Sequence, residues 1–271
     1  MANKTTKKVK RILNVVPSKD TDQDWRMENA LASGMMAAPA ALPASKDLRE
    51  AWWKVGDQGS TGSCVGWGTA EGVLRWHFVK VNRIPNDANK SPSLSPRFIW
   101  MAAKETDDSV TRPTTFIESD GTSLKSALDI ARKFGVVSDS VLPFASGVLY
   151  QGEENTFYAI ASQLKIAAYI NLEKNLSQWR SWLVANGPIL AALKVDKTWD
   201  DATANGGNLD AFQPDTVRGG HCISIVGYKA DGRFIVRNSW GTAWGDKGFG
   251  YATEAYIQGA FFPEAYGINL I

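Results

Sequence analysis

Cysteine and histidine are the residues of this 271-residue chain best suited to nucleophilic chemistry, and there are two of each. Cys64 ends a Gly- and Ser-rich run that begins near Gln58, and a largely apolar segment follows it. A thiol at the start of a helix feels the positive end of the helix dipole, which favours the thiolate. A cysteine in such a setting is nevertheless often a buried structural residue. Cys64 is therefore a candidate nucleophile, with a structural role left open.

One of the two histidines is placed to act as a base. His221 follows Gly219 and Gly220 and precedes an apolar run that is typical of a buried strand. His77 lies inside the helical segment expected after Cys64, and we expect a structural role for it. This leaves His221 as the candidate base.

A second polar residue is expected to lie beside His221. The dipeptide Asp231-Gly232 predicts a turn, and the hairpin would return Asn238 to the same end of the sheet as His221. Trp240 could shield an Asn–His hydrogen bond from water, and such a bond is electrostatically stronger in a dry setting. Asn238 is therefore a candidate hydrogen-bond partner of His221, and the sequence does not fix the register of the two side chains.

The motifs around these residues resemble those of the papain family of cysteine peptidases (the cathepsin and papain type). The matching features are Gln58 upstream of the cysteine, the Gly62-Ser63-Cys64 turn, a His221 strand that ends in Val-Gly-Tyr, and Asn-Ser-Trp-Gly-x-x-Trp-Gly over residues 238–245. They occur in the order in which the family has them, and the similarity extends from about residue 57 to residue 257. The last motif is highly specific.

The resemblance implies a mechanism. Cys64 would attack the scissile carbonyl as a thiolate, and His221 would protonate the leaving amine. Asn238 would orient the imidazole, and Gln58 would stabilise the oxyanion together with the Cys64 N–H. The implied activity is cysteine-type peptide-bond hydrolysis, with an endopeptidase favoured. No metal ion or cofactor is expected.

The resemblance also implies how a substrate binds. An extended peptide or protein segment would lie with its backbone along Gly121, beside Trp240, and Gly219 and Gly220 would leave the main pocket roomy at its rim. We find no residue in the sequence that places a charge at the base of that pocket.

Four features depart from the family pattern. Thr61 stands where the family usually has a cysteine, which removes a disulfide, and Val65 replaces an aromatic residue. The spacing from Cys64 to His221 exceeds the roughly 130–150 residues typical of cathepsins, so we expect loop insertions. Cys222 should point away from His221 into the core, because successive side chains of a strand alternate between faces.

The remaining pattern predicts an α+β fold with two papain-like lobes and an active-site cleft between them. Helices are expected in the first part, at residues 63–79, from 95, at 124–134 and at 176–186. Strands are expected at 189–195, 222–229 and 234–236. We predict a peptidase domain over residues 47–271. Residues 1–46 are expected to be an extension that wraps the domain or is disordered, as a short pro-segment or belt.

Composition and charge limit the partners and the cellular location that can be expected for the protein. The net charge is +2, so the chain as a whole shows no bias towards nucleic acid or membrane partners. No apolar run reaches the length of a membrane span, and the basic start lacks the apolar core of a signal peptide. We therefore expect a cytoplasmic location, with secretion by another route left open.

Three other functions stay open at this point. The chain could be a catalytically silent papain-fold binding module, or an acyl transferase that uses the same thiol. A nucleic-acid role for the basic start is a weaker alternative. Separately, part of residues 1–46 could lie against the lobes and reduce substrate access, while a leader without effect on activity is the other interpretation.

Overall fold

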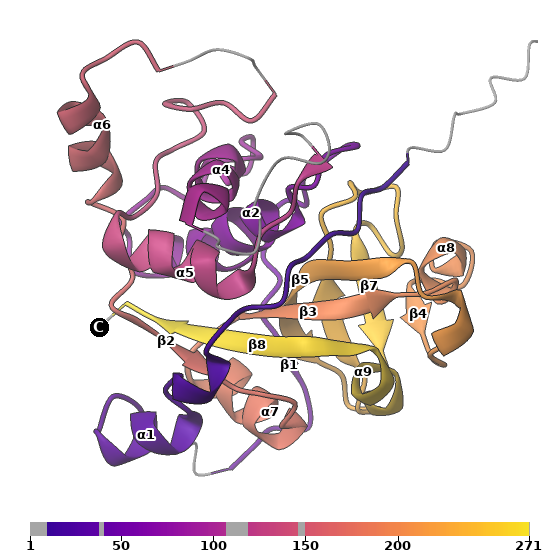
Figure 1. The fold of residues 1–271 in the computed structure, drawn as a ribbon. Helices are drawn as coiled ribbons and strands as arrows, with labels where there is room; N and C mark the ends of the chain where they lie inside the picture. Colours follow the sequence, from indigo (N-terminus) through magenta and orange to yellow (C-terminus); the bar gives the residue numbers. More distant parts are fainter. Residues whose placement is uncertain (1–9, 38–40, 107–118, 146–149, 271) are drawn as a thin grey trace, which may run out of the picture.

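The computed structural model describes residues 10–37, 41–106, 119–145 and 150–270 (Figure 1). Lys4, Lys7 and Lys8 of the basic start lie outside these ranges. Within them, no helix is both long enough and apolar enough to cross a membrane.

The α-helices are α1 Met27–Ala32, α2 Cys64–Thr69, α3 Arg75–Lys80, α4 Pro96–Thr106, α5 Leu124–Lys133, α6 Glu154–Ala161, α7 Leu176–Ala185, α8 Thr198–Asp201 and α9 Glu254–Ala260. The strands are β1 Lys46–Asp47, β2 Ala168–Asn171, β3 Ile189–Val195, β4 Asn208–Leu209, β5 Gly219–Tyr228, β6 Phe234–Arg237, β7 Phe249–Ala252 and β8 Phe261–Asn269.

An eight-stranded sheet forms the second half of the fold. Its order is β2-β8-β3-β5-β6-β7-β4, with β1 paired to β5, and every pair except β4–β7 is antiparallel. Alternate residues of β3 enter two different cores, because strand side chains alternate between faces. Ala191 and Leu193 pack with the tryptophans of α7, whereas Leu190 and Ala192 pack with α2 and α5. The expected α+β architecture is thus confirmed.

Local sequence features define the ends of the helices around Cys64. The helix expected at residues 63–79 is present as α2 and α3, joined by a π-helical turn at Ala70–Leu74. Ser95 accepts a hydrogen bond from the Phe98 N–H at the start of α4, and Ser123 caps α5 in the same way. Gly135 follows α5 with a φ of +96°, a conformation that favours glycine at a helix end.

The N-terminal segment wraps the domain. It runs between the helices and the sheet before reaching α1 (Figure 1). The Val16 N–H donates to Thr122 O over 3.2 Å on the helical side, and the Val15 N–H donates to Gly220 O over 3.3 Å on β5. Further along, Met27 and Ala30 are buried in the core beside the sheet. The described part of the extension thus makes contacts on both sides of the domain.

Candidate active site

Cys64 is the first residue of α2, as the sequence predicted, and it is completely buried. Its thiol accepts a hydrogen bond from the backbone N–H of Cys222, the residue after His221. Burial raises the pKa of the Cys64 thiol to about 11, and this effect outweighs the backbone N–H groups that lower it. The thiolate expected from the helix position is therefore disfavoured while the site is covered.

His221 lies on β5 within an aromatic enclosure. Its ring centroid is 4.9 Å from that of Trp240 and 5.6 Å from that of Trp199, which meets it edge-on. Burial lowers the pKa of His221 to about 4, although a hydrogen bond to Asn238 opposes the shift. In this covered state, burial thus favours a neutral thiol and a neutral imidazole over the ion pair.

The hydrogen bonds of Asn238 determine which nitrogen of His221 carries the proton. Asn238 Oδ1 accepts the Ser239 N–H over 2.8 Å, so this atom is the amide oxygen and not the nitrogen. His221 Nε2 lies 2.7 Å from the same oxygen and must donate to it. In the neutral ring Nδ1 is then unprotonated, and it is buried with no hydrogen-bond partner among the described residues. The ring therefore keeps one nitrogen free to accept a proton.

Gln58 is joined to the same network through Ser239. The Ser239 hydroxyl donates to Gln58 Oε1 over 2.7 Å, and the Gln58 N–H donates to Ser239 O over 2.8 Å. Gln58 Nε2 donates one hydrogen to Thr61 O over 2.9 Å. An amide nitrogen carries two hydrogens, so the second could serve a developing oxyanion.

Residues 11–18 of the N-terminal segment, which we call the strap, lie on the residues expected to bind substrate. The Asn14 carbonyl occupies the space that a Cβ atom would need on Gly121, and the Leu13 carbonyl does the same at Gly219. Gly219 has a φ of +155°, at the edge of the range that favours glycine. The glycines therefore allow a close backbone approach, and here the chain's own segment makes it.

Arg11 fastens the start of the strap beside Trp240. It donates to Asp57 Oδ1 over 2.6 Å, to Gly59 O over 2.8 Å and to Trp240 O over 3.2 Å. Its guanidinium carbon also lies 5.7 Å from the Trp240 ring centroid. The strap is thus attached on the Gln58 side of the site as well as on the Gly121 side.

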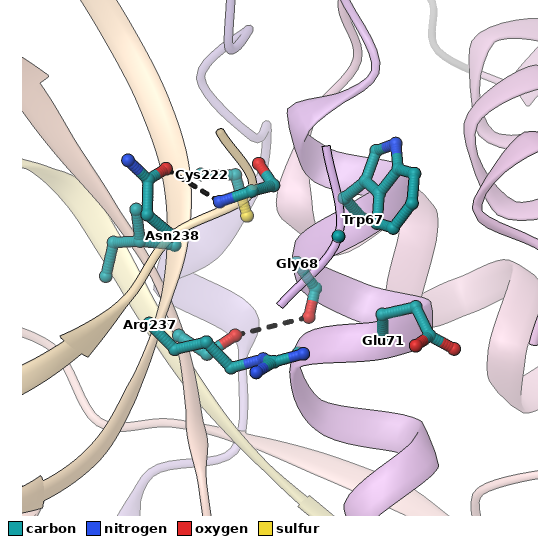
Figure 2. A pocket seen from close by; sticks show the side chains of 11 residues that line it. Trp67, Gly68, Glu71, Cys222, Arg237 and Asn238 are labelled. Atoms are coloured by element: carbon teal, nitrogen blue, oxygen red, sulfur yellow. Dashed lines mark hydrogen bonds between the residues drawn. The ribbon is translucent and has the colours of Figure 1, made fainter. Parts of the chain in front are cut away.

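Two hollows of different size adjoin the site. A small cavity of about 10 Å³ lies behind it, between α2 and β5, next to Asn238 at the end of β6 (Figure 2). It has room for about one water molecule. A larger pocket of about 650 Å³ is lined by Trp199, Trp240 and Trp244 together with Arg11 of the strap. Only the larger one could hold part of a peptide.

The remaining sequence predictions can be placed as well. Cys222 points into the core between β5 and α2, as strand alternation requires, and it forms no disulfide with Cys64. His77 is buried, in keeping with its expected structural role, and burial lowers its pKa to about 3. Among the described residues, no cluster of His, Cys, Asp or Glu is suited to hold a metal ion.

Sequence reasoning missed several residues of the site. Ser239 was part of the recognised motif, but its role as the link between Asn238 and Gln58 was not inferred. Trp199 carried no signal, because it lies 22 positions before His221 in a short helix. Arg11 lies in the basic start of the chain, where nothing in the sequence indicates its contacts with Asp57 and Trp240. Contacts between such distant positions appear only in the folded chain.

A helical lobe packed on an antiparallel sheet, with a buried cysteine beside an Asn-bonded histidine, defines the class of papain-like folds. The sequence model described as "Papain family cysteine protease" matches residues 42–258. The chain belongs to this family.

Individual relatives support the same placement. The chain is 31% identical over 121 residues to macrodontain-1 from Ananas macrodontes, covering 42% of this chain and 51% of that protein. It is 25% identical over 254 residues to cathepsin F from Drosophila melanogaster, covering 83% of this chain and 36% of that protein. The chain thus spans about half or less of the length of these relatives. Xylellain, a cysteine protease from Xylella fastidiosa, shares the fold with a TM-score of 0.74 at 21% identity, over 98% of both chains.

Proposed function

We propose that this chain is a cysteine-type endopeptidase in which Cys64 is the nucleophile and His221 the base. The observation that carries the proposal is the fixed tautomer and orientation of the His221 ring. Its Nε2–H is held by Asn238, and its Nδ1 is free to accept the thiol proton. The Cys64 thiolate would attack the peptide carbonyl, and the protonated His221 would then give its proton to the leaving amine. Water would release the acyl group from sulfur.

Gln58 and the Cys64 N–H would stabilise the oxyanion. Ser239 orients the Gln58 amide, which leaves one Nε2 hydrogen available for this role. One such donor is typically worth about 3 kcal/mol in the transition state. Gly121, Gly219 and Gly220 would line the path of an extended peptide on one side of the scissile bond, and Trp240 would contact the leaving-group side.

The strap would inhibit the enzyme from within its own chain. Its backbone occupies the approach to Gly121 and Gly219, so a substrate cannot lie there at the same time. The Val15–Gly220 hydrogen bond holds it directly beside His221. Activity would therefore require that residues 11–18 move away or are cut.

Hydrolysis of a fluorogenic peptide amide tests the proposed function. We expect Cys64→Ala to abolish turnover while circular dichroism shows a folded protein, and Cys222→Ala, the matched control, to remain active. Turnover that survives in Cys64→Ala would refute the nucleophile assignment. Product analysis with and without an added amine would show whether the acyl group passes to water or to an amine. A folded wild-type chain that binds peptides but turns none over would favour the silent binding module.

A further inference from the structure

A series of hydrogen bonds runs from the ring of Trp199 into the core beside the sheet. Trp199 Nε1 donates to the Tyr256 hydroxyl oxygen over 2.7 Å, and the Tyr256 hydroxyl donates to Asp196 Oδ1, also over 2.7 Å. An indole N–H can only donate, so the Tyr256 oxygen must accept it and its own proton must go to the carboxylate. All three side chains are completely buried. The series therefore has one direction, and water does not compete for its groups.

Asp196 is the fixed end of this series. It directly follows β3, and its second oxygen, Oδ2, accepts the Gln213 N–H over 2.6 Å and lies 3.0 Å from the Thr198 hydroxyl. Burial and the hydrogen bond to Asp196 raise the pKa of Tyr256, so its hydroxyl stays protonated and keeps donating. Tyr256 lies in the first turn of α9, where its N–H donates to the Thr253 side chain. The series thus joins the end of β3 to α8 and α9.

The other end of the series lies against the histidine of the active site. The ring centroids of His221, Trp199 and Trp240 are 4.9 to 5.6 Å apart in all three pairs. Trp199 therefore contacts both other rings, and it does not face Trp240 across the imidazole. The Trp240 indole N–H is buried and has no hydrogen-bond partner among the described residues, so only packing places this ring. Of the two tryptophans, Trp199 is the one that the core anchors through its indole N–H.

One hydrogen bond cannot fix the plane of the His221 ring. The bond from Nε2 to Asn238 Oδ1 holds one atom of the ring, and a tilt of the ring about that atom would still displace Nδ1. Nδ1 must face the Cys64 thiol to take its proton, and a small displacement of a catalytic group reduces turnover strongly. Trp199 meets the imidazole at 84° and Trp240 lies against it at 32°, so the two rings restrict the tilt from different directions.

We propose that Tyr256 and Asp196 are positioning residues of the active site that act through Trp199. They fix the Trp199 ring, and this ring and Trp240 together hold the His221 imidazole in the orientation that accepts the thiol proton. This inference rests on the proposed peptidase function. A hydrogen-bond network that served stability alone would lower the free energy of unfolding when broken, but it would leave the imidazole of the folded protein unchanged.

Tyr256→Phe tests the proposal, because it removes the hydroxyl and keeps the ring. Tyr266→Phe is the matched control. The Tyr266 hydroxyl also donates to a carboxylate, Asp24 Oδ2 over 2.7 Å, but its ring packs in the core on the other face of the sheet. Both variants are made in the Arg11→Ala chain, where the strap is loosened. We expect both to lower the free energy of unfolding, and only Tyr256→Phe to lower kcat for a fluorogenic peptide amide, by about tenfold or more.

A second readout needs no turnover. In the full-length chain the proton on His221 Nε2 is buried and donated to Asn238, so it should give a resolved signal in proton–nitrogen NMR spectra. We expect this signal to shift and broaden in Tyr256→Phe and to stay unchanged in Tyr266→Phe. A His221 signal that is the same in folded Tyr256→Phe as in the wild type, or an equal loss of kcat in the two variants, would overturn the proposal.

Asp196→Asn provides the same test if Tyr256→Phe does not fold. The amide keeps the size of the carboxylate but loses its charge, and its N–H groups face partners that themselves donate. Both readouts should then change in the same direction, and two unchanged readouts in this folded variant would overturn the proposal. A wild-type chain that hydrolyses no peptide contradicts the proposed function alone, whereas the His221 signal still tests how the ring is held.

Discussion

Asn238 Oδ1 accepts hydrogen bonds both from its neighbour Ser239, over 2.8 Å, and from His221 Nε2, over 2.7 Å. Because the Ser239 N–H fixes the oxygen in place, the asparagine imposes one tautomer and one ring orientation on the histidine. In the proposed mechanism Asn238 therefore positions His221 and need not exchange a proton itself.

Substitution of the two residues should separate these roles. We expect His221→Ala to remove nearly all turnover, because the proton acceptor is lost. Asn238→Ala should be at least about tenfold milder in kcat, because an unheld imidazole still samples the productive orientation. Steady-state kinetics on the two variants, with circular dichroism as the folding control, checks this. Equal loss of kcat in two folded variants would show that Asn238 does more than orient the ring.

Release of the strap should raise activity. Arg11 is 17% exposed and joins the strap to Asp57, Gly59 and Trp240. Loss of these contacts is worth about 1 kcal/mol, so Arg11→Ala should increase kcat/KM about fivefold in the full-length chain. Lys10→Ala, which changes the exposed neighbouring cation, is the matched control. A kcat/KM unchanged by Arg11→Ala would contradict inhibition by the strap.

A point substitution is preferable to truncation at Asp47 for this purpose. Truncation would also remove Met27 and Ala30, which are buried in the core. An unstable truncated chain would report the loss of packing and not the loss of inhibition.

The pH dependence of thiol reactivity should depend on the strap. Burial raises the pKa of Cys64 to about 11 and lowers the pKa of His221 to about 4, and both shifts favour the uncharged pair near neutral pH. Alkylation of the full-length chain by iodoacetamide should therefore be slow at pH 7 and rise as the pH approaches 11. In Arg11→Ala the site becomes hydrated more often, so the rise should move to lower pH.

A freely accessible pair should then give a bell-shaped kcat/KM profile, whose limbs belong to the Cys64–His221 pair jointly. Alkylation profiles that coincide for the wild type and Arg11→Ala would show that the strap does not control the thiol.

Much of the fold was predictable because local pattern and tertiary role agree. The expected strand at residues 189–195 coincides with β3, whose apolar residues fill both faces of a central strand. The helix expected at 176–186 matches α7 to within one residue. The papain-family motifs likewise predicted the hydrogen-bonded His221–Asn238 pair and its Trp240 neighbour.

The features that escaped prediction depend on contacts between distant positions. The Ser18 N–H donates a hydrogen bond to Glu264 Oε1, although the two residues are 246 positions apart in the sequence and neither lies in a motif. The strap shows no helical or strand-like pattern of apolar residues. It is an extended segment between two lobes, and it is held there by its shape and by backbone hydrogen bonds. The pKa shifts at Cys64 and His221 arise from burial, which the sequence around either residue does not encode.

Mass-spectrometric mapping of the wild-type chain after reaction with an electrophilic peptide tests the central claim most directly, because labelling requires the nucleophile, its base and the cleft together. We expect one modification per chain, on Cys64, and faster labelling in Arg11→Ala. Both thiols are buried, but Cys222 should stay unmodified because its side chain packs against Gly68 of α2, where release of the strap opens no access. Modification of Cys222 in place of Cys64, or no modification of a folded Arg11→Ala chain, would contradict the account.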